Sequence, residues 1–318
     1  MSNKPLRVAF QMDAMDDVNI AGDSTFAMII EAQTRGYEIY HYLPNDLIYD
    51  EGTVRAFAHP MTVRYEEGNH YTFGEGRMMD LAEDIDVIQM RQDPPFDMAY
   101  ITATHLLDLI HPKTLVVNNP TEVRNAPEKL FVTHEKFRAL MPPTMITRRL
   151  EDIQAFREKH GEIIIKPLFG MGGSGVFHLK EGDSNLMALT ELFFETSREA
   201  LMIQKFLPQV VHGDKRIILI DGKASGGVNR VPAKGEIRSN LVAGGIAVET
   251  DLTEKEQEIC DILGPELKSR GLLFVGIDVI DGWLTEINVT SPTGIMAINK
   301  FKNVNLAGDL WDAIEAKV

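Results

Sequence analysis

A glycine-rich segment in the middle of the chain limits the possible folds more than any other feature. Gly170, Gly172 and Gly175 match the pattern G-x-G-x-x-G, and residues 176–180 after them alternate apolar and polar side chains as a strand does. The loop therefore joins a strand to a strand, which excludes a Rossmann turn, and no Lys-Ser or Lys-Thr follows the last glycine as in a P-loop. A protein-kinase glycine loop also joins two strands, but neither His-Arg-Asp nor Asp-Phe-Gly follows downstream.

The connection that remains is a flexible glycine hairpin that can lie over a polyphosphate and offer it backbone N–H groups. Small residues let the backbone approach phosphate oxygens without a clash from Cβ. Lys166 lies four residues before the hairpin and carries the charge that neutralises a phosphate. The alternative is an ordinary surface hairpin beside a solvated lysine.

A second polar cluster lies in an apolar hairpin. Residues 272–289 form two apolar stretches around Asp281-Gly282, a dipeptide typical of a tight turn. Because side chains alternate along a strand, Glu286 and Asn288 share one face of the second stretch.

The face on which Asp278 lies depends on the length of the turn. A two-residue Asp-Gly turn pairs Asp278 with Thr285 and directs it to the opposite face. A three-residue loop over residues 280–282, with its glycine left-handed, pairs Asp278 with Leu284 and returns it to the face of Glu286. We expect the three-residue loop.

In that arrangement, Asp278, Glu286 and Asn288 present three hard oxygen ligands between apolar strands. Carboxylates buried without a cation are costly, so the pattern predicts a bound Mg²⁺ that takes its remaining ligands from substrate phosphates and water. Mn²⁺ is a possible substitute. The alternative is a pair of acids exposed on an edge hairpin.

The first 120 residues alternate strands and helices. We predict strands at Leu6–Met12, Tyr37–Tyr42, Ile85–Arg91 and Thr114–Val117. We predict helices from the Asp23-Ser24 cap to Gly36 and at Met98–Ile110. This order favours an open, mostly parallel sheet, although no glycine fingerprint for a dinucleotide follows the first strand. Such sheets bind ligands beyond the carboxyl ends of their strands, where the sequence places four candidate substrate-binding residues: Asp13, Asn19, Arg91 and Asp93. Solvated loops are the alternative.

The chain is long enough for two or three domains. Its 318 residues exceed what one core supports, so lobes with a cleft between them are expected. A boundary is expected at residues 120–125, followed by helices over Ala126–Leu140 and Glu151–Lys159. Strands, glycine turns and interspersed helices are expected from Glu162 onward.

Polar residues in this later part suit a nucleotide and an anionic substrate. The apolar strand at residues 202–208 can present backbone groups to a purine edge, and Asp214 after it can reach a ribose hydroxyl. A segment with the composition of a mobile loop is flanked by two arginines and an amide: Arg230, Arg238 and Asn240. Solvated side chains are the alternative for each arginine.

Charge and cysteine content exclude several classes of protein. With 32 Lys+Arg against 47 Asp+Glu, the formal net charge is −15, so nucleic acid or an anionic membrane would repel the chain. The single cysteine, Cys260, allows no intramolecular disulfide and fits a reducing compartment; on a helix begun by the capping box Thr253-x-x-Glu256, it is expected to be a packing thiol. No apolar run approaches the ~18 residues of a membrane span, and no signal-peptide core follows the N-terminus. We expect a cytoplasmic protein whose partners are small molecules.

Taken in order, these motifs resemble those of ATP-grasp ligases, and more specifically those of bacterial glutathione synthetases over nearly the whole chain. The matching stretches cover residues 90–97, 128–131, 165–168, 170–173 and 285–292. The resemblance implies an α/β fold: an N-terminal substrate-binding domain with an open parallel sheet (1–123), then an ATP-grasp fold of α+β character with a small lobe carrying the glycine loop (124–202) and a C-terminal lobe carrying the metal site (203–318).

The resemblance also implies ATP-dependent joining of γ-glutamylcysteine and glycine through an acyl phosphate, with a role for each matching residue. ATP would be bound by Lys129, Lys166, Gly170, Met171, Gly172, Gly173, Ser174, Gly175, Gln204, Lys205, Phe206, Leu207 and Asp214. Asp278, Glu286 and Asn288 would hold Mg²⁺, and the catalytic arginines would be Arg216, Arg230 and Arg238. Substrate carboxylates would be gripped by Arg238, Asn240 and Ser291. A homo-oligomer, dimer or tetramer, is implied as well.

The sequence departs from the family pattern at two places. Lys205 and Phe206 stand where Asn-Tyr is expected in the hinge, and the mobile loop around residues 233–235 differs. Another ATP-grasp ligase, joining D-alanine or adding glutamate, and a non-catalytic ATP sensor are the alternatives. The presence of all three metal ligands disfavours the sensor.

Overall fold

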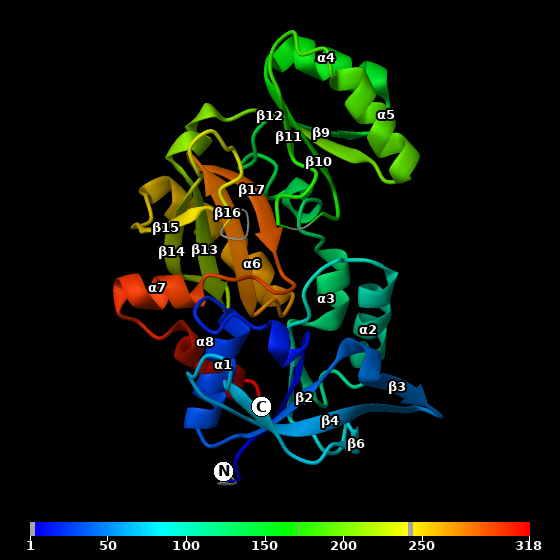
Figure 1. Cartoon of the computed structure of the whole chain (residues 1–318), viewed down its shortest axis with the longest axis vertical. Helices are drawn as coiled ribbons and strands as arrows, with labels where there is room; N and C mark the ends of the chain where they lie inside the picture. The colour runs from blue at the N-terminus through cyan, green and yellow to red at the C-terminus, as the bar shows by residue number, and fades with distance from the viewer. Residues whose placement is uncertain (1–3, 171, 241–243) are drawn as a thin grey trace.

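The computed structural model of the chain describes residues 4–170, 172–240 and 244–318. It is a mixed α/β structure with three sheets, and the sheets lie one after another along the long axis of the molecule (Figure 1). The sheet of the N-terminal part lies at one end, that of the C-terminal part in the middle, and that of a small lobe at the other end. The domain limits proposed at 123/124 and 202/203 lie inside α3 (Pro120–Asn125) and β12 (Leu201–Lys205) and remain a proposal.

Four parallel strands form the centre of the N-terminal sheet, in the order β2-β1-β7-β8. They confirm the four predicted strands and are β1 (Arg7–Gln11), β2 (Glu38–Tyr42), β7 (Val87–Met90) and β8 (Leu115–Val117). The helices α1 (Ser24–Thr34) and α2 (Met98–Asp108) are also as predicted, and the Asp23 carboxylate caps α1 by accepting the Phe26 N–H at 2.7 Å. Because β1 and β7 are parallel neighbours, their carboxyl ends meet at one edge of the sheet. The short 3₁₀ helix η1 (Met15–Asp17) follows β1 at this edge.

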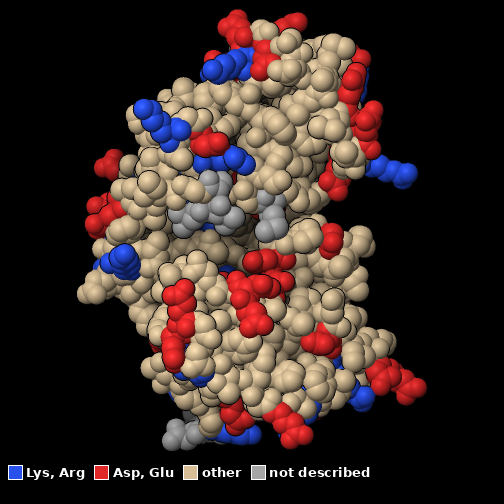
Figure 2. Space-filling view, in the orientation of Figure 1, with Lys and Arg blue, Asp and Glu red and all other residues tan. Residues whose placement is uncertain are grey.

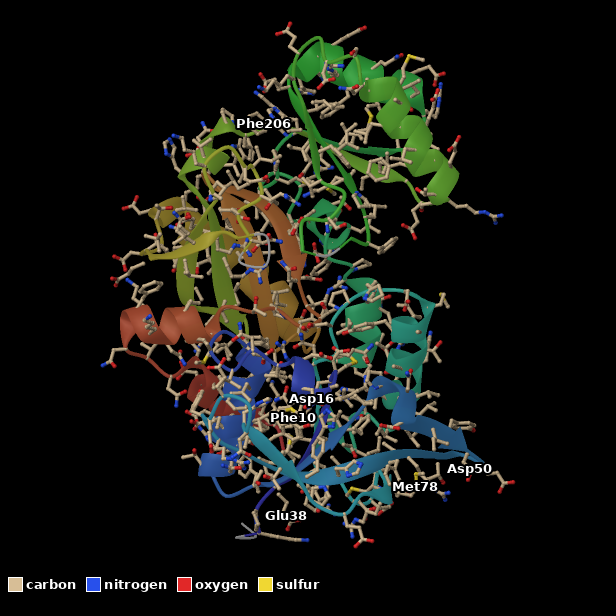
Figure 3. The ribbon with its side chains drawn as sticks, in the orientation of Figure 1. Phe10, Asp16, Glu38, Asp50, Met78 and Phe206 are labelled. Atoms are coloured by element: carbon tan, nitrogen blue, oxygen red, sulfur yellow. The ribbon has the colours of Figure 1, made fainter. Side chains whose placement is uncertain are left out.

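An antiparallel arm that the sequence analysis does not predict extends this sheet. After η2 (Pro44–Asp46) it comprises β3 (Leu47–Asp50), β4 (Thr53–Val63), β5 (Tyr71–Phe73) and β6 (Arg77–Asp80), and β4 pairs with β2. Glu51 and Gly52 both have positive φ, 46° and 92°, so the β3–β4 turn has the left-handed backbone of a tight hairpin. Figure 3 shows Asp50 and Met78 on this arm, at the end of the molecule opposite Phe206. The arm thus lies far from the later strands.

The predicted helix over Ala126–Leu140 is wrong. Among the described residues of this segment, the only regular element is η3 (Phe131–Thr133). The carbonyls of Glu128 and Leu140 accept the N–H groups of Ile287 and Leu284, at 3.1 and 2.9 Å. Pairing with a neighbouring strand, together with burial of Phe131, outweighs the local helix preference.

The small lobe is a four-stranded antiparallel sheet with the order β11-β10-β12-β9. Its elements are β9 (Thr144–Thr147), α4 (Leu150–His160), β10 (Ile163–Pro167), β11 (Phe177–Leu179), α5 (Leu186–Thr196) and β12. α4 confirms the helix predicted at Glu151–Lys159. The two helices pack on one face, over a small core that includes Ile153, Ile163 and Leu189 (Figure 1). The opposite face is left for the cleft.

The C-terminal sheet is antiparallel, with the order β15-β14-β13-β16-β17. It follows η4 (Pro208–His212) and consists of β13 (Asp214–Ile220), β14 (Lys223–Val231), β15 (Ile246–Glu249), β16 (Phe274–Ile280) and β17 (Trp283–Asn288), with α6 (Glu254–Ser269) between β15 and β16. The chain ends in α7 (Ile295–Lys302) and α8 (Leu306–Glu315), which return to α1, where the Trp311 indole N–H donates to the Met28 carbonyl at 2.9 Å. The last helices therefore tie the C-terminal part to the N-terminal sheet.

Asn118, directly after β8, joins the N-terminal sheet to the C-terminal one. Its side-chain nitrogen donates to the carbonyls of Phe274 and Val289, at 2.8 and 2.7 Å, and its side-chain oxygen accepts the Phe274 N–H at 2.9 Å. All three bonds are buried, so one carboxamide satisfies three backbone groups of two strands. None of the helices in the described part of the chain has the length and apolar character that a bilayer span needs.

Cys260 is expected to be inert in the folded chain. The capping box of Thr253 and Glu256 begins α6 as predicted, the thiol is buried, and burial, assisted by the charge of Asp261, raises its pKa to about 12. Because the thiolate is the reactive species, Ellman's reagent at pH 8 should release below ~0.1 equivalent of chromophore from native protein. Unfolded protein should release the full amount. Rapid, complete reaction of the native chain would contradict this placement.

Candidate active site

The hairpin of β16 and β17 brings the three predicted metal ligands to one face, by a route that the sequence analysis did not predict. The expected three-residue loop is wrong: Ile280 pairs with Trp283, so Asp281 and Gly282 alone form the turn, both with positive φ. A bulge between Asp278 and Val279 then shifts the register and pairs Asp278 with Glu286.

Because paired residues share a face, the bulge places the Asp278 and Glu286 carboxylates side by side. Asn288 pairs with Gly276 on the same face. Glycine at 276 leaves room there, since a Cβ would lie 2.8 Å from Pro292 and 3.1 Å from the Arg216 side chain.

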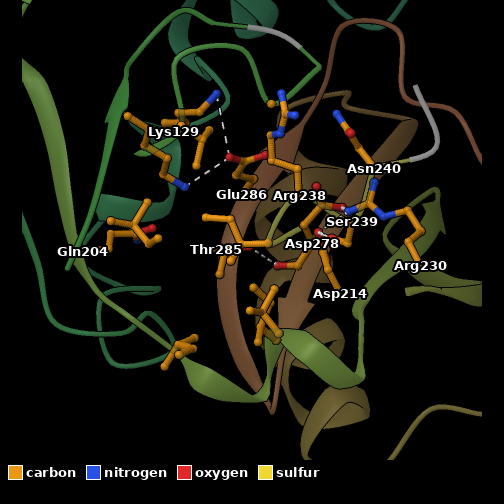
Figure 4. Close-up of a pocket in the computed structure, with 18 of the residues that line it drawn as sticks. Lys129, Gln204, Asp214, Arg230, Arg238, Ser239, Asn240, Asp278, Thr285 and Glu286 are labelled. Carbon is orange, nitrogen blue, oxygen red and sulfur yellow. Dashed lines mark hydrogen bonds and ion pairs between the residues drawn. The ribbon is translucent and has the colours of Figure 1, made fainter. Parts of the chain in front are cut away.

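A cleft lies between this face and the sheet of the small lobe, and it encloses about 1070 Å³ counted out to open solvent. Figure 4 shows Lys129 and Gln204 on one side of it and Asp278, Asp214 and Arg230 on the other. Eighteen predicted residues line it: Lys129, Lys166, Gly170, Gly172, Gly173, Ser174, Gln204, Lys205, Phe206, Leu207, Asp214, Arg216, Arg230, Arg238, Asn240, Asp278, Glu286 and Asn288. In the space-filling view, acidic side chains gather near the middle of the molecule beside the opening (Figure 2).

Glu286 lies between two lysines. Lys166 donates to Glu286 Oε1 at 3.1 Å, and Lys129 Nζ lies 3.7 Å from the same oxygen (Figure 4). Lys129 also donates to the Gly170 carbonyl at 3.1 Å and to Glu128 Oε1 at 2.5 Å. Burial opposes ionisation of Glu286, but Lys129 and Lys166 outweigh it and hold its pKa well below the ordinary value. Burial and the nearby Glu286 charge instead raise the pKa of Glu128.

Asp278 lies between two arginines. Arg216 binds it through Nε at 2.5 Å and Nη2 at 3.0 Å, and Arg230 Nη2 lies 3.0 Å from its Oδ1. Burial favours the neutral acid, yet Arg216 and then Arg230 lower the pKa of Asp278. Arg230 also donates to Asp214 Oδ2 at 2.6 Å, and burial raises the pKa of Asp214. The site thus holds ionised acids and cations in a region shielded from water.

The glycine hairpin and the segment after β14 meet over this cleft. Gly173, with φ of 75°, approaches Arg238 so closely that a Cβ would lie 3.2 Å from its Cδ and 3.4 Å from Asn240 Nδ2. A side chain at Gly173 would therefore be strained by the positive φ and would require the Arg238 side chain to shift by a few tenths of an ångström. Met171 and residues 241–243 lie outside the described residues.

The hinge residues lie at the end of β12. The N–H of Lys205 donates to Pro143 O at 3.0 Å, and that of Phe206 to Glu162 O at 2.9 Å. The Phe206 ring stacks on the His178 imidazole with 3.8 Å between centroids, and Glu162 in turn binds His178 at 2.6 Å. The hinge backbone therefore bonds to the residues just before β9 and β10, and the Phe206 ring packs on β11.

The residues chosen for a metal have the chemistry to hold one. Two ionised carboxylates and an amide share one face. The side-chain nitrogen of Asn288 is buried and has no hydrogen-bond partner among the described residues, so no bond from this nitrogen holds the carboxamide in one orientation. In the described ranges no three His, Cys, Asp or Glu side chains cluster as metal ligands. A divalent cation here must therefore take its remaining ligands from Asn288, a nucleotide and water.

The candidate substrate residues of the N-terminal domain lie outside the cleft lining. The Asp93 N–H donates to Asp13 Oδ2 at 2.7 Å, and the Ser291 hydroxyl bonds the Asp93 carboxylate. Arg91 is buried and donates to Thr25 Oγ1 at 3.0 Å and Pro292 O at 3.1 Å. The structure thus brings Asp13, Arg91, Asp93 and the Ser291 turn into one group. Asn19 instead forms a local turn, accepting the Ala21 N–H at 3.1 Å.

Sequence reasoning missed three polar residues of the site. Ser239 is buried and its hydroxyl donates to Asp214 Oδ2 at 3.1 Å, and Thr285 donates to the Asp278 carbonyl at 3.0 Å. Glu128 was overlooked although it adjoins Lys129. Adjacency to a predicted residue is the one signal that pointed to all three, since Thr285 precedes Glu286, Glu128 precedes Lys129, and Ser239 lies between Arg238 and Asn240.

Solved structures share this fold at low sequence identity. D-cycloserine synthetase DcsG aligns with a TM-score of 0.69 at 14% identity, covering 98% of this chain and 100% of that chain. A RimK domain ATP-grasp protein of Sphaerobacter thermophilus gives 0.64 at 15% identity, covering 96% and 98%. The ATP-grasp ligase PsnB, solved with a precursor variant, Mg and ADP, gives 0.61 at 18%, covering 99% of each. The fold, with a glycine hairpin facing paired acids across a cleft, is that of an ATP-grasp ligase.

Full-length relatives narrow this class to one family. Glutathione synthetases of Rhodopseudomonas palustris and Brucella melitensis are 55% and 54% identical over 98% of this chain and 99% of their own, and that of Vibrio parahaemolyticus is 42% identical with the same coverage. The family model "Prokaryotic glutathione synthetase, N-terminal domain" matches residues 6–124, and "Prokaryotic glutathione synthetase, ATP-grasp domain" matches residues 128–303. The chain therefore belongs to the prokaryotic glutathione synthetases and is an ATP-dependent carboxylate–amine ligase.

Proposed function

We propose that the chain joins γ-glutamylcysteine to glycine, consuming ATP and releasing glutathione, ADP and phosphate. The observation that carries the proposal is the convergence of two lysines, two arginines and two ionised acids in one cleft closed by a glycine hairpin. This arrangement neutralises phosphate charge and holds a carboxylate beside it, which is what carboxylate activation needs.

In the proposed complex, ATP lies between the two sheets. Lys129 and Lys166 exchange their ion pairs with Glu286 for bonds to the phosphates, and the hairpin at residues 170–175 covers them. The base lies against the hinge at residues 204–207, and Asp214 is directed at the ribose through its Oδ1, which is buried and has no partner in the described part of the chain.

The proposed Mg²⁺ ligands are Asp278, Glu286 and Asn288. When bound there, the ion supplies positive charge that offsets the negative charge on the phosphates during transfer. Mn²⁺ is proposed as a substitute of the same ligand preference.

The reaction follows from the low reactivity of a carboxylate toward an amine. The cysteinyl carboxylate oxygen attacks the γ-phosphorus of ATP, the bond to the ADP oxygen breaks, and an acyl phosphate forms. The glycine amine, formed when the ammonium group loses one proton, then attacks the acyl carbon; phosphate leaves with the electrons of the C–O bond and takes up the second proton that the nitrogen releases. Arg216 and Arg230 stabilise the charge that develops, and Arg238 with Asn240 closes over the intermediate and excludes water.

The N-terminal group is proposed to hold the γ-glutamyl end of the donor. Asp13, Arg91 and Asp93 lie at the carboxyl edge of the parallel sheet, and Ser291 links this edge to the strand that carries the metal ligands. Asn19, in the turn after η1, is proposed to act with them. A donor held here has its far carboxylate directed toward the arginines of the cleft.

A substrate panel tests the proposal. We expect ADP release that needs Mg²⁺, γ-glutamylcysteine and glycine together, and calorimetry should show that Mg²⁺ strengthens ADP binding. ADP release that depends instead on D-alanine pairs or on a glutamate acceptor would replace the proposed substrates by those of another ATP-grasp ligase.

Three further proposals accompany the function. We propose that the chain acts in the cytoplasm, in keeping with its single buried cysteine. We propose that it assembles as a homo-oligomer, dimer or tetramer, which light scattering of the purified protein can test. We also retain the division into units 1–123, 124–202 and 203–318, which limited proteolysis can test.

A further inference from the structure

Ser239 places a buried hydroxyl in the lining of the nucleotide cleft. Ser239 is 4% exposed, whereas the side chain of its neighbour Arg238 is 41% exposed. The backbone at this position is tightly packed, because a Cβ at Gly245 would lie 1.9 Å from the Ser239 carbonyl oxygen. The serine is therefore held in one place, and the partner of its hydroxyl there is Asp214 (Figure 4).

The bond from Ser239 helps to orient the Asp214 carboxylate. The serine hydroxyl donates to Asp214 Oδ2 at 3.1 Å, and Arg230 Nη2 donates to the same oxygen at 2.6 Å. Asp214 Oδ1 is buried and has no partner in the described ranges. Two donors on one oxygen leave the other oxygen to a ligand in the cleft that Asp214 lines. Because an ionised carboxylate only accepts hydrogen bonds, the ligand group must be a donor, such as a sugar hydroxyl.

The two donors to Asp214 differ in what else they bond. Arg230 Nη2 also lies 3.0 Å from Asp278 Oδ1, so this arginine is shared between two acids. In the proposed complex Asp278 holds a metal ion and Arg230 stabilises charge on the transferring phosphoryl group, so the bond from Arg230 to Asp214 can change during the reaction. The neutral hydroxyl of Ser239 takes no part in that exchange of charges. Its bond can hold the carboxylate of Asp214 throughout.

We propose that Ser239 is a positioning residue for the nucleotide, which holds Asp214 so that Oδ1 accepts a hydrogen bond from a ribose hydroxyl. The inference rests on the proposed placement of ATP in this cleft. It concerns binding alone, so no covalent bond changes at either residue. Its consequence is a preference for ribonucleotides over deoxyribonucleotides that depends on a side chain which does not itself touch the sugar.

Calorimetry on the full-length protein with Mg²⁺ tests the inference with three nucleotides: ADP, its 2′-deoxy analogue and its 3′-deoxy analogue. The parent should bind ADP about 10-fold more tightly than the analogue that lacks the bonded hydroxyl, since a hydrogen bond to a charged acceptor is then missing. In Ser239→Ala this ratio of affinities should fall by about 3- to 10-fold, because only Arg230 of the two donors remains. Ser239→Thr, which keeps the hydroxyl, should retain most of the ratio.

Two further variants separate positioning of Asp214 from a general loosening of the cleft. Ser225→Ala removes another hydroxyl of β14, which donates to the Lys223 carbonyl at 3.3 Å, and should keep the parent ratio. Asp214→Ala removes the acceptor and should bring the ratio near one. Adding Ser239→Ala to Asp214→Ala should then change the ratio no further, because Ser239 acts through Asp214.

Three results would overturn the inference. An unchanged ratio in Ser239→Ala, whether or not the affinity for all three nucleotides falls together, would show that the serine does not direct Asp214 at the sugar. A further fall of the ratio when Ser239→Ala is added to Asp214→Ala would show that the serine acts by another route. Equal binding of the three nucleotides by the parent would remove the ribose contact, but it would leave the proposed ligation standing, because that reaction is measured as ADP release with the donor and the acceptor.

Discussion

Glu286→Gln is expected to fold as the parent chain does and to lose Mg²⁺-dependent turnover by on the order of 10²- to 10³-fold. The substitution keeps the size of the side chain and one acceptor oxygen but removes the negative charge. Both the proposed metal and the two lysines depend on that charge, because Lys166 and Lys129 lie 3.1 and 3.7 Å from the same Glu286 oxygen. Without this charge, the proposed metal loses a ligand and the two lysines lose the carboxylate that positions them.

Folding should survive this change because the Glu286 side chain faces the cleft and is 21% exposed. Lys129 keeps its bonds to Glu128 and the Gly170 carbonyl, and glutamine at 286 still offers an acceptor oxygen to Lys166. The midpoint of thermal denaturation should therefore stay near the parent value, whereas the affinity for ADP in the presence of Mg²⁺ should fall sharply.

Glu249→Gln is the matched control for this variant. Glu249 lies on β15 of the same sheet, and its exposed carboxylate pairs with Lys302 at 3.2 Å, away from the cleft. We expect parent turnover in this control. Full activity in Glu286→Gln, measured as ADP release over a Mg²⁺ titration, would remove Glu286 from the metal site.

The register of the β16–β17 hairpin shows how far sequence reasoning reaches in this chain. Alternation along one strand correctly grouped Glu286 and Asn288, because that pattern is local. The face on which Asp278 lies depends on the turn and on a bulge. The expected three-residue loop placed Asp278 on the correct face, but the structure reaches that face through a two-residue turn and a bulge. Two-residue turns recur at Asp221-Gly222 and Asp281-Gly282, and both hairpins carry a bulge nearby. A bulge has no strong sequence signal, so only the fold reveals it.

Long-range pairing explains the larger errors. The segment 126–140 was predicted to be a helix, yet its backbone bonds to β17, more than 140 residues away in the sequence, from Glu128 and Leu140. The bond of Ser239 to Asp214 is also long-range, because Ser239 follows β14 and Asp214 begins β13. The glycine hairpin, the lysines and the parallel strands were predictable because a few adjacent residues determine each of them.

Asn118→Ala is expected to lower the free energy of unfolding by about 3 kcal/mol. The variant removes a carboxamide that bonds three buried backbone groups: the N–H and carbonyl of Phe274 and the carbonyl of Val289. Each buried group left without a partner costs roughly 1–3 kcal/mol, and a methyl group cannot replace any of the bonds. The effect is large because Asn118 follows the N-terminal sheet whereas all its partners belong to the later strands.

Chemical denaturation monitored by tryptophan fluorescence measures this loss, and Asn69→Ala provides its comparison. Asn69 is exposed and bonds Glu66 at 3.0 Å on the surface, so its replacement should change stability by no more than about 0.5 kcal/mol. If Asn118→Ala unfolded at the parent denaturant concentration, the carboxamide would be a passive neighbour of these strands. The residues that line the cleft bond neither the side-chain nitrogen nor the side-chain oxygen of Asn118. We therefore expect Asn118→Ala to unfold at a lower denaturant concentration than the parent while it still binds Mg²⁺ and ADP normally at low temperature. That result would show that Asn118 stabilises the contact between the two sheets and not the cleft.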